Sequence, residues 1–395
     1  MLTFAYISLA LLLSNTDVAV HWSFDSIDNG TAHESANNLH AQVHGAQHQQ
    51  GALHGGLYFD GIDDYADVTA INGVQKILGS LDEGTISAWF RFDHIPSYAE
   101  ILDIFYFGDA DDFSDYGTTA DGYTLEVGHF SSQSRLYWTC IEVDENLHSD
   151  VPLCWSTHEQ LAKDRWYHIV SATDSTGTRV YLDNIEIYDG SNLVWNFGDA
   201  YKRRFLADIT RQEVLWFGKG PWNHEHQFYH GMIDEITIWR TALTPEQVQA
   251  EYERVANVGS FVIADDIANE FATLQPIVQF NGLLENIVKF KWQVNGAAWS
   301  SQVNESLLSE WSLQLQIPET PGRHEIKILG QNASGKNFID SRFVIRPDLN
   351  EDGVVNIHDL LLMIGAWGDC DCIEDFTGDG RVSIADILIL IGAWG

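Results

Sequence analysis

Basic residues are scarce in this sequence of 395 residues: 21 Lys and Arg stand against 57 Asp and Glu, a net charge of −36 with histidine counted neutral. The scarcity excludes a nucleic-acid binder that relies on a basic face, and it disfavours attraction to an anionic membrane. Because 45% of the residues are hydrophobic and only 20% are charged, the acidity does not indicate disorder. The excess acid fits either a solvated surface or oxygen ligands for a hard cation, and its position along the chain must decide.

Long hydrophobic runs are also rare. The run at residues 4–13 is too short to span a bilayer and no later run is long enough, so we predict no transmembrane span. Its place at the N-terminus is typical of the core of a signal peptide, and we expect residues 1–19 to be one and the protein to be secreted or held at the cell surface. The alternative is that the run forms a buried first strand.

Cysteine is limited to four residues, and none has Cys-x-x-Cys zinc spacing or a catalytic context. Cys140 and Cys154 flank a polar segment, residues 141–153, that we expect to be a long loop between strands. A disulfide between them would close about 15 residues and contribute about 3 kcal/mol. Cys370 and Cys372 are two residues apart, so they pair either with other partners or with each other under strain.

The C-terminal end contains a tandem repeat. Residues 348–359 are followed by LLLMIGAWG, and residues 375–386 are followed by ILILIGAWG. A twelve-residue calcium loop has oxygen ligands at positions 1, 3, 5, 7 through a backbone carbonyl, 9 and 12, with glycine at position 6. The two repeats supply Asp348, Asn350, Asp352, the Val354 carbonyl, Asn356 and Asp359, and then Asp375, Thr377, Asp379, the Arg381 carbonyl, Ser383 and Asp386.

We therefore predict two bound calcium ions in this tail, with Gly353 and Gly380 at the sharp turns. The alternative, an Asp/Gly-rich turn that caps a helix, would not require an oxygen donor at every ligand position. An apolar helix is expected after each loop, over residues 359–367 and 386–394 and stopping at Gly365 and Gly392, and no helix is expected before either loop.

In these features residues 348–395 resemble the dockerin type I module, a duplicated half-EF-hand of bacterial secreted polysaccharide-degrading systems. The resemblance implies that calcium folds the module and that a cohesin-like protein is its partner. Dockerins that bind cohesins typically carry small polar residues at loop positions 10 and 11 and basic residues late in the helix. Here the loop positions are Ile357-His358 and Ile384-Ala385, and no Lys or Arg follows. The apolar helix faces could instead pack on each other or on the preceding sandwich.

The region from about residue 20 to 240 is β-like, with short runs rich in Val, Ile, Thr and aromatic residues between Gly, Asp and Asn turns. So many strands predict a two-sheet sandwich. Predicted strands include residues 56–59, 84–92, 123–127, 166–172, 179–182, 214–218 and 232–239. One closing helix is expected from Leu243 onward, with Thr244 as N-cap, Pro245 at the first helical position and Gln247 completing a capping box.

Four motifs occur here in order: Gly56-Leu-Tyr-Phe-Asp-Gly-Ile-Asp-Asp-Tyr, Gly84-Thr-Ile-Ser-Ala-Trp-Phe, Arg165-Trp-Tyr-His-Ile-Val and Gly231-Met-Ile-Asp-Glu-Ile-Thr-Ile-Trp. Together they resemble the LamG-like jelly-roll family of the concanavalin A-like lectin/glucanase superfamily, over residues 20–256. The resemblance implies the fold. It is much less specific for the ligand, since this fold hosts lectins, carbohydrate-binding modules, adhesion domains and some glycosidases.

A glycosidase on this fold would need two carboxylates on one face of a strand, about 5–5.5 Å apart for retention. Glu100 and Asp103 are three residues apart, and Asp234 and Glu235 are adjacent, so each pair would point to opposite faces. We therefore predict no catalytic residues. A sugar site needs aromatic platforms beside polar groups, and the candidates are Tyr137, Trp155, Trp195 and Trp222, each of which could equally pack in a core or seal a loop.

The jelly-roll resemblance also implies one structural calcium near the junction of the first and last strands. Asp25 and Asp234 are its candidate ligands, and Glu34 stands where a further aspartate is expected. Trp89, Trp166 and Trp239 lie in the strand motifs and are expected in the core.

Residues 258–346 contain strongly alternating runs, such as 287–294 and 324–330, which predict a small antiparallel sandwich. The region resembles bacterial Ig-like or fibronectin-like spacer modules. The whole chain is then mainly β: a jelly roll, an Ig-like spacer and a small α-helical dockerin-like tail over residues 347–395. The expected function is that of a secreted, non-catalytic bacterial protein that binds a glycan or cell-surface ligand. The alternatives are a glycoside hydrolase or lyase acting through the jelly roll, and a structural or adhesive surface protein.

Overall fold

The computed structural model describes residues 17–68, 70–94, 101–110, 122–130, 133–143, 149–156, 161–188, 193–195, 204–220, 228–264, 268–301 and 310–394. The chain divides after Val258 into two compact units. No helix within these described ranges is long and apolar enough to cross a membrane. Most of the predicted signal peptide lies outside them. Its predicted boundary after Ala19 falls inside the first strand, whose ladder begins with the pair Val18–Trp239.

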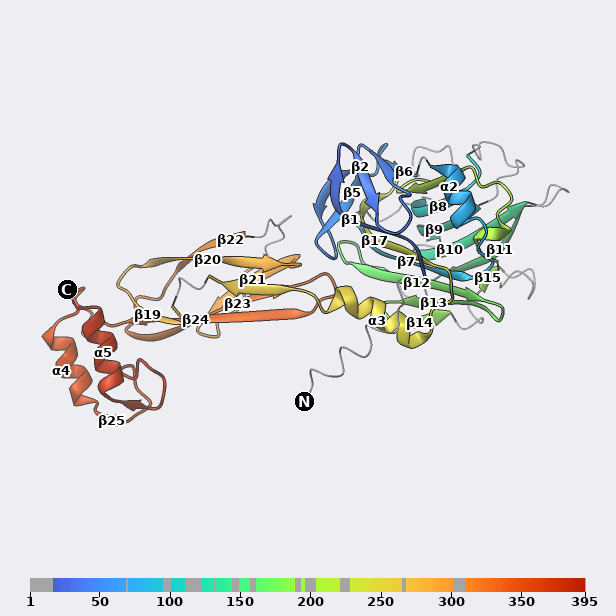
Figure 1. The fold of residues 1–395 in the computed structure, drawn as a ribbon. Coiled ribbons are helices and arrows are strands. Elements are labelled where there is room, and N and C mark those ends of the chain that lie inside the picture. The colour runs from blue at the N-terminus through green and yellow to red at the C-terminus, as the bar shows by residue number, and fades with distance from the viewer. Residues whose placement is uncertain are drawn as a thin grey trace. The chain divides into compact units, whose positions relative to one another are not determined.

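The strands of the first unit form one continuous hydrogen-bonded sheet that folds into two facing layers (Figure 1). β1 belongs to layer 1 and joins the layers, because it pairs with β17 and also with β2. Layer 1 contains β4 (Gln47–Gln50), β5 (Gly55–Asp60), β1 (Val18–Asp28), β17 (His230–Trp239), β7 (Gly84–Phe92), β12 (Tyr167–Asp174), β13 (Gly177–Leu182) and β14 (Ile185–Tyr188). Layer 2 contains β2 (Thr31–Glu34), β3 (Ala41–His44), β6 (Tyr65–Asp67), β16 (Val214–Phe217), β8 (Ile101–Gly108), β9 (Gly122–Phe130), β10 (Gln133–Val143), β11 (Ser149–Ser156) and β15 (Leu193–Trp195).

The interior between the layers is apolar because alternate residues of each strand point into it. In β9, Tyr123, Leu125 and Val127 belong to the core, whereas Thr124 and Glu126 lie on the opposite face. Short helices accompany the strands, among them α2 (Ile71–Ile77) and η2 (Leu206–Asp208). The strand pattern read from the sequence is confirmed, since the predicted runs fall within or overlap β5, β7, β9, β12, β13, β16 and β17.

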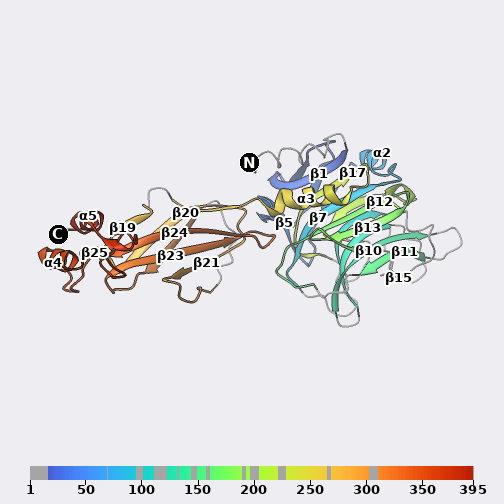
Figure 2. The ribbon, with the colours of Figure 1, turned by 90° about the horizontal axis from the view of Figure 1, so that it is seen from below.

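Helix α3 (Pro245–Ala256) covers the outer face of layer 1 (Figure 2). It begins as predicted: the Thr244 hydroxyl accepts the N–H of Gln247, the Gln247 side chain accepts the N–H of Thr244, and Pro245 occupies the first turn. Val248 of the helix packs in a buried cluster with Trp239 of β17. The sequence therefore determined this helix locally, and its apolar side determined which surface it covers.

His168 of β12 is buried beneath α3. Neither ring nitrogen has a hydrogen-bond partner among the residues that the structure describes. The His168 ring stacks on Trp89 at 5.0 Å between centroids and lies 5.8 Å from Tyr252 of α3. Burial lowers the pKa of His168 to about 3, and the positive charge of Arg254 acts in the same direction. His168 is therefore neutral in the folded protein at pH values where the unfolded chain binds a proton.

Acid should destabilise the first unit through this histidine. The unfolded pKa is about 6.5, so between that value and the folded pKa the unfolded state binds more protons. The contribution of His168 is complete above the unfolded pKa and is lost as pH falls toward the folded one, by about 2 kcal/mol between pH 7 and pH 5. Between pH 7 and pH 5 the free energy of unfolding should therefore fall by about 2 kcal/mol less in the variant His168→Gln than in the unaltered protein. Urea unfolding of both proteins at the two pH values measures this, and equal losses would contradict it.

The second unit begins with a sandwich of two small sheets. Its core contains Phe280, Ile317, Ile326, Ile328 and Val344. One sheet contains β18 (Ser260–Ile263), β20 (Ile277–Glu285) and β22 (Glu310–Gln316), and the other contains β19 (Glu270–Ala272), β24 (Asn337–Arg346), β23 (Gly322–Gln331) and β21 (Lys289–Val294). The pair β19–β24 is parallel, which departs from the small antiparallel sandwich that we predicted.

The C-terminal tail contains α4 (Ile357–Gly365), β25 (Gly368–Asp369), β26 (Arg381–Val382) and α5 (Ile384–Gly392). The helices end at the predicted glycines but begin two residues earlier than predicted, because Asn356 and Ser383 are their N-caps. Met363, Phe376 and Leu390 form a buried cluster with Ile345 of β24. The tail therefore packs on the neighbouring sandwich within the same unit.

The segment between Cys140 and Cys154 is not the long loop that we predicted. β10 and β11 continue past both cysteines, because the antiparallel pairing of the two strands extends to Val143 and Ser149. In the β10–β11 pairing, Cys140 lies opposite Leu153 and Cys154 lies opposite Thr139, so the two cysteines are offset by one residue. Successive residues of a strand point to opposite faces, and this offset therefore does not favour a disulfide between them. The cysteine side chains lie outside the described residues, so the disulfide itself stays a prediction.

Candidate functional site

The first loop of the tail, residues 348–359, folds around its own carboxylates. Asp348 accepts the backbone N–H groups of Asp352 at 3.1 Å and Gly353 at 2.7 Å. Gly353 has φ of 87°, the conformation expected of the glycine at position 6. The side-chain amides of Asn350 and Asn356 both reach Asp352 Oδ2, at 2.9 and 3.4 Å. The predicted ligand positions 3, 5 and 9 therefore converge.

Asp359 at position 12 is fully buried at 0% exposure. Its Oδ1 accepts the N–H groups of Leu349 at 2.8 Å and Asn350 at 3.2 Å, and its Oδ2 accepts that of Asn356 at 2.8 Å. The Val354 carbonyl at position 7 lies 3.2 Å from the Asn356 side-chain nitrogen. Asp359 thus ties the start of the loop to the start of α4.

The second loop, residues 375–386, repeats this arrangement with hydroxyl groups. The Thr377 hydroxyl lies 3.2 Å from Asp375 Oδ1 and 3.1 Å from Asp386 Oδ1, and the Ser383 hydroxyl lies 3.2 Å from Asp386 Oδ2. Burial raises the pKa of Asp386, but hydrogen bonds from Thr377 and Ser383 outweigh it, so the pKa is lowered. Gly380 has φ of 87°. The backbone N–H groups of Gly378, Asp379 and Gly380 donate to Asp375, and that of Arg381 donates to Asp379.

In the first loop the Asn350 and Asn356 side chains reach Asp352, and in the second loop the Thr377 hydroxyl reaches both Asp375 and Asp386. Each loop therefore gathers several oxygen-bearing side chains of the kind that a hard cation prefers. Between the loops, Cys370 and Cys372 are joined to each other by a disulfide, the second of the two predicted alternatives. Both half-cystines pack against the buried cluster of the tail.

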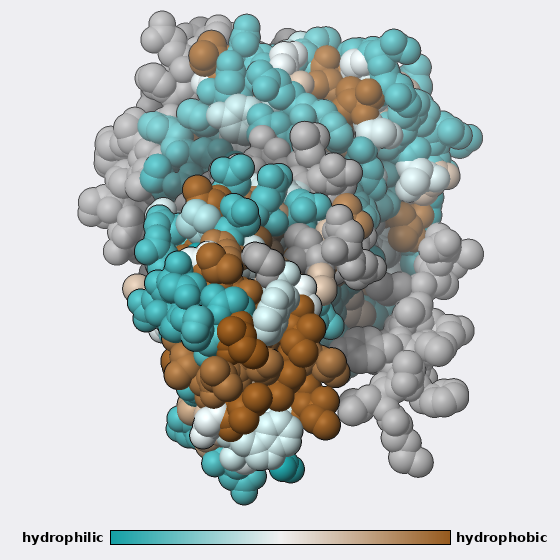
Figure 3. Space-filling view, turned by 90° about the vertical axis from the view of Figure 1, so that its left-hand side faces the viewer, coloured by the Kyte–Doolittle hydropathy of each residue, from teal (hydrophilic) through white to brown (hydrophobic). Residues whose placement is uncertain are grey.

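The surface of the tail helices is strongly apolar (Figure 3). Exposed side chains occur in pairs that are equivalent in the two repeats, at 45% to 66% exposure. The pairs are Ile357 and Ile384, Leu361 and Leu388, Ile364 and Ile391, and Trp367 and Trp394. We call these eight residues the tail surface. Apolar side chains gathered in this way typically mark a contact with another molecule.

The outer face of layer 2 carries aromatic and polar side chains placed by strand register. Trp216 of β16 lies opposite Asp67 of β6 on one side and Tyr106 of β8 on the other. Tyr65 of β6 lies opposite His44 of β3, and their rings stack with centroids 4.4 Å apart. Directly opposed residues of antiparallel strands share a face, so these side chains lie together. All except Tyr106 are half-buried, which leaves part of each at the surface.

Lys219 extends this face. Its Nζ lies 4.4 Å from the ring centre of Trp216 and 4.7 Å from that of Tyr65. Burial lowers the pKa of Lys219, against the effect of the Asp67 charge, and burial raises the pKa of Asp67, against the effects of His44 and Lys219. We call His44, Tyr65, Asp67, Trp216 and Lys219 the aromatic face. It offers ring surfaces beside hydrogen-bonding groups.

Two carboxylates lie opposite each other further along the same layer. Asp103 of β8 is paired with Glu126 of β9, and they are 0% and 6% exposed. The Thr124 hydroxyl donates to Asp103 Oδ1 at 2.7 Å, whereas Asp103 Oδ2 has no hydrogen-bond partner in the part of the chain that the structure describes. Burial raises the pKa of Asp103 to about 7. Burial and the neighbouring Asp103 charge raise the pKa of Glu126 well above its usual range.

Comparison with known families identifies this fold. Residues 60–249, a little under half of the chain, match the model of the concanavalin A-like lectin/glucanases superfamily. This region is a concanavalin A-like jelly roll. The predicted jelly roll is thereby confirmed for these residues. No curated protein matches the chain.

Many solved structures are similar to this chain at low identity, among them the following three. Domain 4 of AbnA, a GH43 extracellular arabinanase from Geobacillus stearothermophilus in complex with arabinotriose, is 16% identical with a TM-score of 0.40, covering 59% of this chain and 97% of that one. Trypanosoma rangeli sialidase in complex with 2,3-difluorosialic acid is 13% identical with a TM-score of 0.41, covering 60% and 32%. The Ruminococcus gnavus IT-sialidase CBM40 bound to α2,3 sialyllactose is 11% identical with a TM-score of 0.38, covering 50% and 96%. The match thus spans about a third of the sialidase.

The structure does not describe the side chains of the four aromatic residues that we predicted as platforms for a sugar ring. Tyr137, Trp155 and Trp195 lie in β10, β11 and β15, but their side chains are outside the described residues, and so is the whole of Trp222. The backbone register places Tyr137 opposite Glu126. These four sites stay predictions.

The side chains of Asp25 and Asp234 both accept hydrogen bonds from the segment around Leu53 and Gly55. The strands that carry them, β1 and β17, are neighbours as predicted. The N–H of Gly55 donates to Asp25 Oδ1 at 3.3 Å, and that of Leu53 donates to Asp234 Oδ2 at 3.0 Å. Burial and the Glu235 charge raise the pKa of Asp234 well above its usual range. A calcium ion at this loop stays a prediction.

Glu34, the further acid noted for that place, is bound by the backbone. Its carboxylate is 4% exposed and accepts four backbone N–H groups, from His21 at 2.9 Å, Ala36 at 2.6 Å, Asn37 at 2.5 Å and Leu39 at 3.3 Å. Both oxygens are thereby engaged. Glu34 instead holds the turn after β2 in place.

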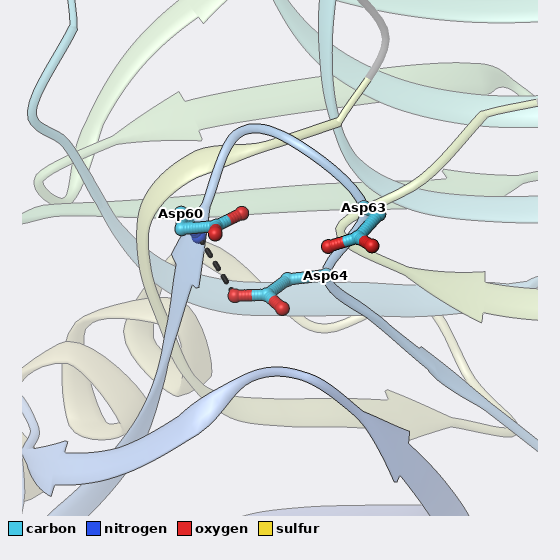
Figure 4. A group of neighbouring side chains, drawn as sticks. All are labelled: Asp60, Asp63 and Asp64. Carbon is cyan, nitrogen blue, oxygen red and sulfur yellow. Dashed lines mark hydrogen bonds between the residues drawn. The ribbon is translucent and has the colours of Figure 1, made fainter.

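An acidic turn follows β5, and the sequence reasoning did not single it out (Figure 4). Asp60, Asp63 and Asp64 each place a carboxylate oxygen within 4.8 Å of the others. The N–H of Asp60 donates to Asp64 Oδ2 at 2.9 Å, and that of Ile62 donates to Asp60 Oδ1 at 2.8 Å. Burial raises the pKa of Asp64. These two hydrogen bonds close the turn.

The sequence reasoning also missed the aromatic face and the Asp103–Glu126 pair. It searched for paired carboxylates within one strand, where Asp103 has no suitable partner, but the partner lies on the next strand. The alternation of Tyr123, Leu125 and Val127 could have placed Glu126 on the outer face. The register that brings it opposite Asp103 is not encoded locally.

Proposed function

We propose that this is a secreted, non-catalytic protein whose jelly roll binds a glycan or other cell-surface ligand and whose calcium-dependent, dockerin-like tail anchors it to a partner. The observation that carries the binding role is the aromatic face. Sugar rings bind proteins through stacking of their C–H faces on aromatic rings and through hydrogen bonds to their hydroxyl groups. Trp216 and Tyr65 supply rings, and Asp67, His44 and Lys219 supply polar groups next to them.

The charge of the protein indicates which class of glycan it binds. The net charge of −36 repels polyanions, and Lys219 already lies close to Asp67. We therefore expect a neutral glycan rather than a sulfated or polyuronic one.

Hydrolysis by the jelly roll is the second candidate, and one observation favours it: Asp103 and Glu126 are two carboxylates on one face. Asp103 is fully buried, however, and a β-carbon added to Gly220 would lie 2.1 Å from its Oδ2. A glycosidic bond would have to reach that oxygen through the backbone packed against it. This packing supports a binding role over a catalytic one.

Replacing Trp216 should weaken glycan binding. The full chain is first screened on a glycan array and then titrated with the neutral glycan that it binds best. The variant Trp216→Ala should bind this glycan about 30-fold more weakly than the unaltered chain, because a tryptophan at the centre of a contact typically contributes about 2 kcal/mol or more. Trp367→Ala, which removes an exposed tryptophan of the tail, is the matched control and should bind as tightly as the unaltered chain.

Three results would count against this proposal. Equal affinity of Trp216→Ala and the unaltered chain would remove the aromatic face from the binding site. Release of new reducing ends from the bound glycan would favour the hydrolase, and silence on every glycan would favour a structural or adhesive protein.

The convergent oxygens of the tail loops support two calcium ions there. The ligands would be those of positions 1, 3, 5, 7, 9 and 12 in each repeat, and calcium would supply the attraction that holds these like-charged carboxylates together. The tail surface supports the anchoring role, because apolar pairs repeated on two helices suit a protein partner. A cohesin-like protein is the expected partner, and residues 258–346 are then an Ig-like or fibronectin-like spacer.

A further inference from the structure

Two buried acids of the jelly roll lie side by side, and no described cation lies beside them. Asp103 and Glu126 stand directly opposite each other on β8 and β9, one completely buried and the other nearly so. No ion pair to either carboxylate is present among the residues that the structure describes. Removing two like charges from water side by side is unfavourable unless a cation or a proton lies between them.

The hydrogen bonds of the two carboxylates do not compensate for their burial. Thr124 donates one bond to Asp103 Oδ1, and no hydrogen bond to the Glu126 carboxylate is present within the described ranges. Asp103 Oδ2 is a buried acceptor that lacks a partner, although Gly220 packs close to it. Such an orphaned oxygen in a folded protein indicates an additional group that accepts its lone pairs.

We propose that Asp103 and Glu126 bind one calcium ion inside the jelly roll. Carboxylate and hydroxyl oxygens are the ligands of hard cations, and a divalent ion neutralises the two charges. Calcium tolerates irregular coordination, whereas magnesium requires a near-ideal octahedron and keeps several waters, which suits a buried pair on neighbouring strands less well. Complete burial of Asp103, which argues against catalysis, does not hinder an ion taken up as the protein folds.

This site differs from both other calcium predictions. It lies on the outer face of layer 2, whereas Asp25 and Asp234 lie at the loop around Leu53, and the remaining ligands lie in the second unit. It is also independent of glycan binding, because it is measured with calcium alone.

Counting bound calcium tests the proposal. The full chain is stripped with a chelator, returned to calcium and examined by native mass spectrometry. The double variant Asp103→Asn/Glu126→Gln should hold one ion fewer per chain than the unaltered protein, whatever the total. Glu213→Gln, which changes an exposed carboxylate just before β16 of the same layer, is the matched control and should keep the full number. An unchanged count in the double variant overturns the proposal and leaves a proton shared between the two acids.

A single variant keeps the test decisive if the double variant does not fold. Glu126→Gln alone should weaken one calcium site by about tenfold or more in isothermal titration, since even changes next to a metal ligand weaken sites by that much. Hydrogen exchange should report the change locally: calcium should protect residues 102–110 and 122–127 in the unaltered chain and less so in Glu126→Gln. Equal protection and equal affinity in the two proteins would also overturn the site.

Discussion

Asp359→Ala is expected to unfold the first loop of the tail, residues 348–359, and to lower the free energy of unfolding of the tail by about 3–5 kcal/mol. The carboxylate is fully buried and accepts the N–H groups of Leu349, Asn350 and Asn356. Each hydrogen bond to a charged group contributes about 1.5–3 kcal/mol, and a buried donor left without an acceptor costs about 1–3 kcal/mol, although these effects are not additive. Hydrogen exchange of residues 348–366 in the full chain measures the loss of protection.

The exposed Asp369 of β25 provides the matched control, and Asp369→Ala should leave protection unchanged. The jelly roll, in the other compact unit, serves as an internal reference. A chelator should reduce protection of both loops in the unaltered chain if calcium is bound there, and should have little further effect on the first loop of Asp359→Ala. Full protection of the variant would mean that the loop does not depend on Asp359.

Glu34→Ala should destabilise the jelly roll by about 3–5 kcal/mol. The side chain satisfies four backbone N–H groups, and one of them belongs to Leu39, whose carbonyl accepts the indole N–H of the fully buried Trp22 at 2.8 Å. Loss of the carboxylate should therefore loosen the turn and the core residue beside it. Urea unfolding followed by tryptophan fluorescence measures the change.

Glu186→Ala removes an exposed glutamate of β14 and is the control for this change; it should shift the free energy of unfolding by less than about 0.5 kcal/mol. Glu34→Gln, which keeps one acceptor oxygen, should fall between the two. If Glu34→Ala were as stable as the control, the four hydrogen bonds would contribute nothing net.

Local signals made much of the fold predictable. Thr244, Pro245 and Gln247 form a helix start that depends on neighbours in the chain, and α3 begins there. Gly353 and Gly380 were expected at the turns because only glycine adopts a positive φ without strain, and both do. Trp89 and Trp239 were expected in the core from their alternating strands and are 1% and 2% exposed.

Other parts of the fold could not be predicted because they depend on how strands pair. The polar segment after Cys140 looked like a loop, but β11 pairs with β10 and turns most of it into a hairpin. Glu34 stood where a further aspartate was expected, and nothing in the sequence indicated that its carboxylate accepts four backbone N–H groups. In each case the deciding partner is a backbone group whose position depends on how the chain closes on itself.

The sequence by itself determined the calcium-loop pattern of the tail, the mainly β character of the chain and the motifs of the jelly roll, because each depends on residues close together in the chain. Only the tertiary structure decided that Trp216 meets Asp67, that Tyr65 stacks on His44 and that Asp103 faces Glu126. The physical reason is register. A shift of one residue between two strands would turn every one of these side chains to the other face of its layer, and the strand sequences alone do not specify that shift.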